Sequence, residues 1–207
     1  MSKDITLESS MPEFWERAYQ SGEIGWDIGR STPVFNDWIN TCKVPLSICI
    51  LGAGNGWDAI NFASKGHIVT AVDFAESAVN NMQTVVKQSD LIMDILHMDI
   101  FDLSKLYINH FDVVLEYTCF CAINPSKRRD YLNMVKHILK PKGELVGLLF
   151  PIDKDPDEGG PPFGVQLKST IKLITEYLFL IKEEVSSLSI KSRVGREIFI
   201  IFRKDGN

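Results

Sequence analysis

The stretch from residue 47 to residue 74 constrains the fold of this chain more than any other. Residues 48–51 are an apolar run, which is typical of a buried parallel strand. A turn rich in glycine follows, and residues 57–65 then have the composition of a helix. Residues 67–72 form a second β-rich run, which ends at Asp73. The pattern predicts a strand, a glycine turn, a helix, a strand and an acid, the unit with which open α/β sheets bind nucleotide-like ligands at their carboxyl edge.

The spacing of the glycines narrows the choice of ligand. Glycine stands at positions 52, 54 and 56, whereas a dinucleotide site would place its third glycine where this chain has Trp57. A G-x-G-x-G turn with an acid at the end of the next strand is the form used by S-adenosylmethionine (SAM) sites. Glycine lets the backbone approach a ligand closely, and the carboxylate of Asp73 can accept hydrogen bonds from two ribose hydroxyls. An ordinary tight turn of an α/β protein is the alternative that this unit alone leaves open.

Strand and helix patterns alternate along the rest of the chain. Outside this unit we expect strands over residues 91–98, 111–115, 144–150, 184–190 and 197–203, and helices over residues 77–88, 126–139 and 168–179. Such alternation predicts one Rossmann-like α/β domain: a seven-stranded, mostly parallel sheet with one antiparallel strand and helices on both faces. The aromatic side chains before the first strand would cover either the edge of the sheet or a ligand. We divide the chain into an N-terminal helical cover over the ligand site, residues 1–40, and the ligand-binding domain, residues 41–207.

Composition disfavours several kinds of protein. The formal net charge of −5 argues against non-specific binding of nucleic acid, because such binding relies on basic surface. The chain has no apolar run of roughly 18 residues and no signal-peptide pattern, so we expect no membrane partner. The four cysteines form no C-x-x-C pair, which indicates reduced thiols and a cytoplasmic protein. The four histidines are scattered among different predicted elements, and we expect no metal site.

Five motifs, spread over nearly the whole chain, resemble those of a known family. They are FWERAY at 14–19, GWDIGRSTP at 25–33, the glycine turn, FCAINP at 120–125 and GGPPF at 159–163. Together they resemble class I SAM-dependent methyltransferases of the thiopurine methyltransferase superfamily, and within it the thiol, thiocyanate and halide methyltransferases. The resemblance implies the class I fold, SAM as the cofactor and S-adenosylhomocysteine as its product.

Motif by motif, the resemblance also implies a set of site residues. It implies contacts to SAM by Trp15, Tyr19, Trp26, Gly52, Gly54, Asp73, Asp99, Ile100, Glu116 and Tyr117. Among these, Glu116 and Tyr117 would line the methyl-transfer side as the catalytic residues, and Trp26 would also contact the acceptor. Arg128 and Phe163 would be further acceptor contacts. Phe163 stands where halide-type relatives often have tyrosine, which removes a hydroxyl from the expected acceptor pocket.

We therefore expect methyl transfer to a small soft nucleophile: a thiol, sulfide, thiocyanate or halide. An in-line displacement from a sulfonium needs positioning in a dry pocket, and it requires neither a metal nor a general base. A thiopurine or aromatic thiol, or a metalloid such as selenium, tellurium or arsenic, stays open as the acceptor. A SAM-binding protein without catalysis also stays open, whereas the glycine spacing disfavours a nicotinamide dehydrogenase. The sequence EYTC at 116–119 is not the Asn/Asp-Pro-Pro-aromatic motif of nucleic-acid N-methyltransferases, and we expect a monomer or weak dimer.

Overall fold

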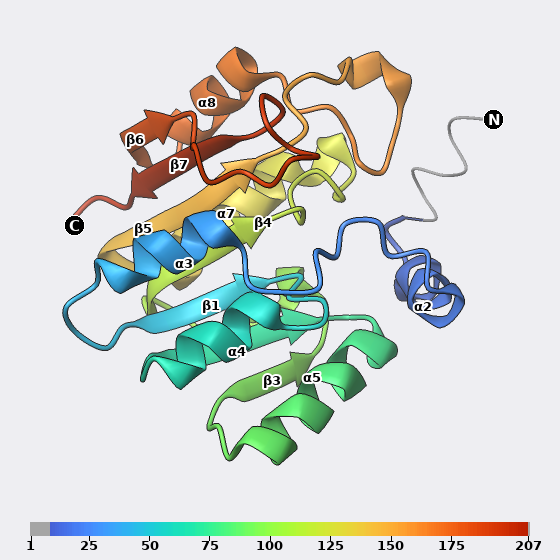
Figure 1. The fold of residues 1–207 in the computed structure, drawn as a ribbon. Coiled ribbons are helices and arrows are strands. Elements are labelled where there is room, and N and C mark those ends of the chain that lie inside the picture. The colour runs from blue at the N-terminus through green and yellow to red at the C-terminus, as the bar shows by residue number, and fades with distance from the viewer. Residues whose placement is uncertain (1–8, 207) are drawn as a thin grey trace.

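The computed structural model describes residues 9–206, and a seven-stranded sheet forms its centre (Figure 1). The strands lie in the order β3-β2-β1-β4-β5-β7-β6. Their bounds are β1 Ser47–Leu51, β2 Ile68–Asp73, β3 Asp94–His97, β4 Phe111–Tyr117, β5 Leu139–Leu149, β6 Phe179–Glu184 and β7 Ile198–Arg203. Strands β1 to β5 pair in parallel, and β7 is antiparallel to both of its neighbours, β5 and β6. The predicted sheet, mostly parallel with one antiparallel strand, is confirmed.

Helices cover both faces of the sheet, as predicted. The α-helices of the described residues are α2 Pro12–Ser21, which lies apart from both faces, α3 Pro33–Asn40, α4 Trp57–Ser64, α5 Glu76–Ser89, α6 Leu103–Leu106, α7 Arg128–Ile138 and α8 Leu167–Thr175. Short 3-10 helices are η1 Ile100–Asp102, η2 Pro125–Lys127 and η3 Pro156–Glu158. Buried side chains of α3, α4 and α5 form one apolar cluster against the sheet. Those of α6, α7 and α8 form a second cluster on the opposite face, so the molecule has three layers.

The N-terminal segment divides into two parts with different surroundings. Helix α3 buries Val34, Phe35 and Ile39 in the core and so belongs to the layers of the sheet. Helix α2 has no buried residue, and it lies beyond the carboxyl ends of the strands (Figure 1). The part of the predicted cover that lies at the site is therefore α2 with the loop that follows it. Residues 1–8 of that cover lie outside the described residues.

One predicted strand is in the wrong place. We expected a helix over residues 168–179 and a strand over 184–190, but α8 ends at Thr175 and β6 occupies Phe179–Glu184. The cause is that β6 is the edge strand, with all six residues exposed and an irregularity in its pairing with β7. An exposed edge strand lacks the alternation of buried and exposed side chains on which a sequence-based assignment depends.

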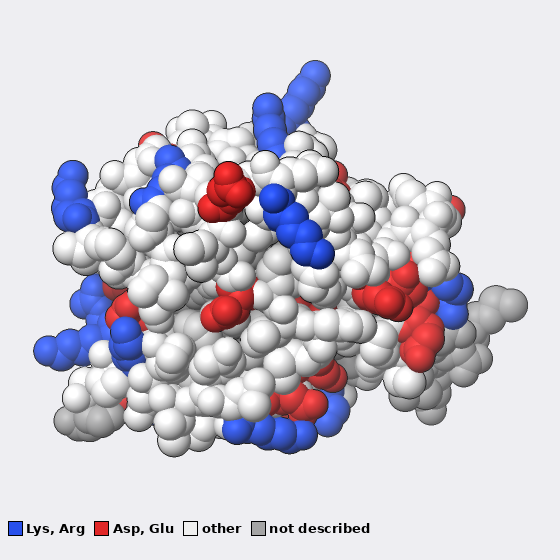
Figure 2. Space-filling view, turned by 90° about the horizontal axis from the view of Figure 1, so that it is seen from below, with Lys and Arg blue, Asp and Glu red and all other residues white. Residues whose placement is uncertain are grey.

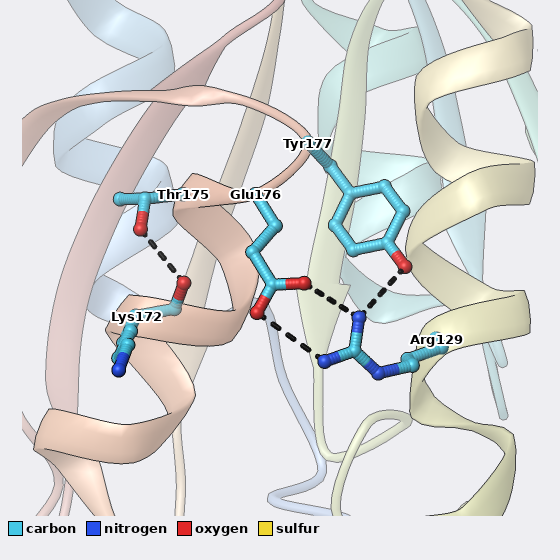
Figure 3. Close-up of polar contacts among 5 residues, drawn as sticks. All are labelled: Arg129, Lys172, Thr175, Glu176 and Tyr177. Atoms are coloured by element: carbon cyan, nitrogen blue, oxygen red, sulfur yellow. Dashed lines mark hydrogen bonds and ion pairs between the residues drawn. The ribbon is translucent and has the colours of Figure 1, made fainter.

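Helices α7 and α8 are joined at the surface by an ion pair (Figure 3). The guanidinium of Arg129 donates to both carboxylate oxygens of Glu176, at 2.5 and 3.2 Å, and also to the hydroxyl of Tyr177 at 3.5 Å. The pair lowers the pKa of Glu176, because Arg129 favours the carboxylate. Water screens exposed pairs of this kind, so we expect it to orient the two helices with little effect on stability.

Charged side chains on the face seen in Figure 2 are scattered, with lysine and arginine interspersed among acidic residues. The described part of this face therefore carries no continuous basic patch, which agrees with the negative net charge of the chain. Within residues 9–206, none of the helices combines the length and the apolar character needed to cross a bilayer.

Candidate active site

A cavity of about 390 Å³ opens at the carboxyl ends of the strands, where parallel sheets bind their ligands. Seven of the residues predicted from the sequence line it: Trp15, Tyr19, Trp26, Gly52, Asp73, Asp99 and Ile100. The rest of its wall includes Phe74 and Phe101 and, after β4, Thr118, Cys119, Ala122 and Ile123. The wall is thus largely apolar and aromatic, with two carboxylates.

The glycine turn and Asp73 form one rigid corner of this cavity. Gly52, Gly54 and Gly56 all have positive φ angles, of 58°, 57° and 76°, so the turn follows a path that other residues rarely adopt. The backbone N–H of Gly54 donates to Oδ2 of Asp73 at 2.8 Å, and the N–H of Ala75 donates to Oδ1 at 2.9 Å. Burial, at 7% exposure, raises the pKa of Asp73, while these two donors oppose the shift. Each carboxylate oxygen keeps a lone pair, as a site for ribose hydroxyls requires.

Asp99 and Ile100 lie at a neighbouring corner, after β3. The carboxylate of Asp99 caps the short helix η1 by accepting from the N–H of Phe101 at 3.0 Å. This cap turns the chain across the strand ends, so that the apolar side chains of Ile100 and Phe101 face the cavity. A flat heterocycle such as adenine is bound well by an apolar wall next to a backbone turn.

Three aromatic side chains from the N-terminal segment cover the cavity. The ring of Trp26 meets those of Trp15 and Tyr19 edge-on, with centroid distances of 5.2 and 5.8 Å. Trp15 also donates its indole N–H to the carbonyl of Ser9 at 2.9 Å. Burial raises the pKa of Tyr19 above its ordinary range, with the charge of Asp73 adding to the effect, so this hydroxyl stays protonated.

Carboxylates fasten this cover to the starts of two helices. Glu16 accepts from the N–H and hydroxyl of Ser77, in the first turn of α5, at 2.9 and 2.5 Å, and these donors lower its pKa. Asp27 accepts from the indole N–H of Trp57, the first residue of α4, at 2.8 Å, and from the amide of Asn55. Acidic groups are stabilised at helix N-termini by the helix dipole. The cover is therefore docked by specific polar contacts as well as by its rings.

A smaller hollow of about 70 Å³ adjoins the main cavity. The two share Trp26, Gly52 and Thr118 as wall residues, and the small hollow also contains the predicted site residues Gly54 and Tyr117. The hydroxyl of Tyr117 donates to Oε2 of Glu197 at 3.1 Å. Burial raises the pKa of Tyr117 beyond its ordinary range, so this hydroxyl is a hydrogen-bond donor and not a base.

Arg193 and Glu197, which sequence reasoning missed, lie behind this wall. The Arg193 guanidinium stacks on the ring of Tyr117, with Cζ 4.5 Å from the centroid, and donates to the carbonyl of Trp26 at 2.8 Å. Arg193 is only 5% exposed. Its Nη1 and the Oε1 of Glu197 have no hydrogen-bond partner among the described residues. No motif signals this pair, since Arg193 and Trp26 are 167 positions apart in the chain.

Glu116, Arg128 and Phe163 were predicted as site residues, but their side chains are outside the walls of both hollows. Glu116 is 2% exposed and accepts from the N–H of Phe120 at 3.0 Å and from the hydroxyl of Tyr131 at 2.9 Å. Burial raises the pKa of Glu116 to about 7.

Arg128 and Phe163 pack behind the same wall. Arg128 stacks on the ring of Phe120, at 4.6 Å from its centroid, and donates to the carbonyl of Gly164 at 3.2 Å. Phe163 is buried, and its backbone N–H donates to the carbonyl of Cys121 at 2.7 Å. Together with Glu116, these side chains support the cavity from behind, where the structure gives them no direct access to it.

The residues present fit SAM. The cavity has the size of a site for a drug-sized ligand, and it combines a buried carboxylate after the second strand with an apolar slot for a heterocycle. A side chain at position 52 would place its Cβ 3.2 Å from the sulfur of Cys119, so the turn packs closely against the segment after β4. Among residues 9–206, histidine, cysteine and acidic side chains form no cluster that could hold a metal ion.

Comparison with known proteins identifies the family. Residues 10–197 match the family described as Thiopurine S-methyltransferase (TPMT). A probable thiol methyltransferase 2 of Arabidopsis thaliana is 32% identical, over 87% of this chain and 78% of that protein. A thiocyanate methyltransferase 1 of Brassica oleracea is 29% identical, over 88% of this chain and 81% of that protein.

The fold has been seen in solved structures as well. A 1,6-didemethyltoxoflavin-N1-methyltransferase of Burkholderia thailandensis, solved with S-adenosylhomocysteine, has a TM-score of 0.77 at 18% identity, covering 98% of this chain and 88% of that chain. At this identity the likeness concerns the fold alone. Sequence, fold and cavity agree: the chain belongs to the thiopurine S-methyltransferase family of SAM-dependent methyltransferases.

Proposed function

We propose that this enzyme methylates a small soft nucleophile, namely a thiol, sulfide, thiocyanate or halide, without a general base. One observation supports this most: among the described residues no histidine lines either hollow, and Lys127, which lines the main cavity, lies 3.3 Å from a carboxylate oxygen of Asp130. The four wall carboxylates, Asp27, Asp58, Asp73 and Asp99, each accept hydrogen bonds from groups of the chain itself. An alcohol or amine acceptor needs a proton removed, whereas a halide, thiocyanate or thiolate arrives ready to react.

The wall around the junction of the two hollows favours such acceptors. When bound, SAM supplies an activated methyl group on a sulfonium. The chain contributes aromatic and apolar surface there, including Trp26, Tyr117 and Thr118, which excludes water from the reacting centre. Large, weakly hydrated anions lose little solvation on entering such surroundings.

Residues of the cavity would hold the cofactor without taking part in proton transfer. We assign the ribose to Asp73, the adenine to Asp99 and Ile100, and the covering contacts to Trp15 and Tyr19. Tyr117 orients the wall through its hydrogen bond to Glu197. Holding the reactants in line is the main catalytic contribution that such a displacement asks of the protein.

We also propose that the enzyme works in the cytoplasm as a monomer or weak dimer, on a small molecule and without nucleic acid. The four cysteines, Cys42, Cys49, Cys119 and Cys121, are free thiols in the structure. Free thiols, two of them buried and two partly buried, agree with a reducing compartment.

An acceptor panel tests the proposed function. Iodide, bromide, chloride, thiocyanate, hydrosulfide, small thiols, an aromatic thiol, a thiopurine, selenite and arsenite are each supplied with SAM, and release of S-adenosylhomocysteine is measured. We expect iodide, thiocyanate, hydrosulfide and small thiols to react fastest, bromide more slowly and chloride slowest, in the order of hydration. A thiopurine or aromatic thiol that outruns every small nucleophile would contradict the proposal and favour the thiopurine alternative.

A further inference from the structure

The segment between β6 and β7, residues 185–197, carries two arginines with different surroundings. A tight turn holds them: the N–H of Arg193 donates to the carbonyl of Ile190 at 2.8 Å, and the N–H of Arg196 donates to the carbonyl of Arg193 at 2.9 Å. Arg193 points inward and is only 5% exposed. Arg196 is partly exposed and forms an ion pair with Asp153 at 2.7 Å. The role of the buried arginine is not explained by any step so far.

The guanidinium of Arg193 contacts three segments that meet at the carboxyl edge of the sheet. Its Cζ lies over two aromatic rings, 4.5 Å from the centroid of Tyr117 and 4.9 Å from that of Phe150. Tyr117 is the last residue of β4, and Phe150 follows β5. Its Nη2 donates to the carbonyl of Trp26, on the loop between α2 and α3, at 2.8 Å. One side chain therefore joins the N-terminal cover to the ends of two central strands.

Stability alone does not account for a guanidinium in this place. Nη1 of Arg193 and Oε1 of Glu197 make no hydrogen bond with the described residues, although both atoms are buried. Burial raises the pKa of Glu197, while Ser189, Tyr117 and Arg193 oppose the shift. Well-packed apolar side chains in place of buried opposite charges often preserve or increase stability. The contacts of Arg193 therefore indicate a role in the position of its neighbours.

The loop that carries Trp26 is attached on two sides. On one side, Asp27 accepts from the indole N–H of Trp57 at the start of α4, at 2.8 Å. On the other side, Arg193 binds the carbonyl of Trp26 and stacks on Tyr117. Without the Arg193 side chain, the loop would keep its attachment to α4 and its aromatic contacts over the main cavity. It would lose the bond that fixes Trp26 relative to Tyr117.

The relative position of these two rings matters for the transfer step. Trp26 and Tyr117 both line the small hollow, and Trp26 also lines the main cavity. An in-line displacement depends on holding the reacting atoms in place, and a misplacement of about 1 Å can cost on the order of a hundredfold in rate. A wall that shifts by such a distance would admit water and hold an acceptor poorly.

We propose that Arg193 is a positioning residue for methyl transfer, which fixes Trp26 and Tyr117 relative to each other at the junction of the two hollows. Glu197 assists by accepting the hydrogen bond of the Tyr117 hydroxyl at 3.1 Å. The inference rests on the proposed function in one respect, namely that the acceptor reaches the methyl group beside these two rings. Arg193 itself touches neither cofactor nor acceptor, so its removal affects turnover more than cofactor binding.

Steady-state kinetics and calorimetry on the full chain separate these two effects. Arg193→Met keeps a long side chain but removes the donor and the guanidinium. With saturating SAM and the fastest acceptor of the panel, its kcat should fall by about ten- to a hundredfold. Its affinity for S-adenosylhomocysteine should stay within about threefold of the wild type, because the cofactor corner lies in other segments. Arg193→Lys can still donate to the Trp26 carbonyl and should recover part of the lost kcat.

Two further variants control for position and for folding. Arg196→Met changes the same residue type in the same turn, over the same Phe150 ring at 5.2 Å, and should keep kcat within about twofold because its ion pair is exposed. Arg193→Met leaves the charge of Glu197 without its opposite charge, which lowers stability. The double variant Arg193→Met/Glu197→Gln removes both charges and keeps an acceptor for the Tyr117 hydroxyl. It should unfold near the wild-type temperature and still show the low kcat.

The outcomes distinguish the inference from the proposed function. A wild-type kcat in the folded double variant would overturn the inference. A loss of S-adenosylhomocysteine affinity as large as the loss of kcat would overturn it too, because Arg193 would then support the cofactor. If a thiopurine or another member of the panel proves to be the best acceptor, the proposed function fails, and the Arg193 variants are measured with that acceptor by the same criteria.

Discussion

Two buried carboxylates stand at the carboxyl edge of the sheet, and they do different things. Asp73 ends β2 and Glu116 is the last residue but one of β4, and both accept hydrogen bonds from backbone N–H groups. Asp73 borders the cavity, whereas Glu116 is enclosed by Tyr131 and the turn that leads to Phe120. Burial raises the pKa of both. The comparison shows that a buried acid at a ligand-binding edge does not necessarily bind the ligand. Whether it can do so depends on which groups of the protein already occupy the lone pairs of its carboxylate.

From this difference we infer a division of roles. Asp73 keeps acceptor capacity toward the cavity and would hold the ribose. Glu116 is better described as a positioning residue, because it fixes the turn that carries Thr118 and Cys119 into the cavity wall. Thr118 has a φ of 60°, a strained value for a threonine, which the surrounding contacts must maintain.

The largest effect is expected at Asp73. Asp73→Ala should weaken S-adenosylhomocysteine by about 1.5–3 kcal/mol for each charge-assisted hydrogen bond lost to the ribose. Calorimetry measures the affinity, and circular dichroism checks the fold. Asp37→Ala, an exposed acid on α3, is the matched control and should bind normally. An unchanged affinity in Asp73→Ala would contradict the assignment of the ribose to Asp73. The functional difference between Asp73 and Glu116 would then no longer hold.

The next largest effect is expected in the backbone of the glycine turn. A Cβ at Gly56 would lie 2.4 Å from the side chain of Met82, and its φ of 76° disfavours any other residue. Gly56→Ala should therefore destabilise the fold by about 1–3 kcal/mol, from overpacking together with backbone strain. Urea unfolding measures the loss. Gly25→Ala meets no atom within 4 Å and has no positive φ, so it should change stability very little.

Glu116 should affect folding more than binding. Glu116→Ala leaves the Tyr131 hydroxyl and the Phe120 N–H without an acceptor in a buried place, which costs about 1–3 kcal/mol of stability. Glu116→Gln keeps one acceptor and should lose less. Both variants should retain affinity for S-adenosylhomocysteine far better than Asp73→Ala does. A loss of affinity as large as that of Asp73→Ala, in a folded variant, would show that Glu116 binds the ligand directly.

Glu116 also gives a signed pH dependence. Its folded pKa of about 7 lies above the unfolded value of 4.5, so the folded state holds the proton more tightly. This contribution to stability is complete below pH 4.5 and is lost as the pH rises to about 7. As the pH rises from 4.5 to about 7, the unfolding temperature of Glu116→Gln should accordingly fall less than that of the wild type. Identical slopes for the two proteins would contradict the assigned shift.

The smallest effect is expected at the surface, away from both carboxylates. Arg129→Gln removes the ion pair with Glu176 that joins α7 and α8 (Figure 3). Because both side chains are exposed, the unfolding temperature should move by about 1 °C or less, and less still in high salt. A larger drop in differential scanning calorimetry would mean that the packing of α8 supports the wall around Glu116.

The same comparison explains what sequence could predict. Asp73 and the three glycines lie within one continuous unit of chain, so their spacing alone predicted a corner whose Gly52 and Asp73 line the cavity. The contacts of Arg193 with Trp26 and of Tyr117 with Glu197 join residues 167 and 80 positions apart, and no local pattern carries that information. The position of edge strand β6 was predicted wrongly for a related reason: all of its residues are exposed, so its sequence shows no alternation of buried and exposed side chains.

The sequence motifs also did not predict in which direction each side chain points. The motifs place Glu116, Arg128 and Phe163 in the correct segments, after strands that end at the cavity. Which way each side chain turns depends on Tyr131, Phe120 and the carbonyl of Gly164, which come from other parts of the fold. A motif thus predicted the neighbourhood of the site and left the lining itself to tertiary packing.

The central claim is that the protein positions a nucleophile that is already reactive and removes no proton from it. The direct test is the ratio of kcat/KM for a small thiol to kcat/KM for thiocyanate, followed against pH. Thiocyanate has no proton to lose near neutral pH, so groups that titrate on the free enzyme cancel in the ratio. We predict that the ratio rises about tenfold per pH unit and levels off at the solution pKa of the thiol, moving with that pKa when a second thiol is used. A ratio that levels off at one lower pH for both thiols would reveal a base on the protein and contradict the account.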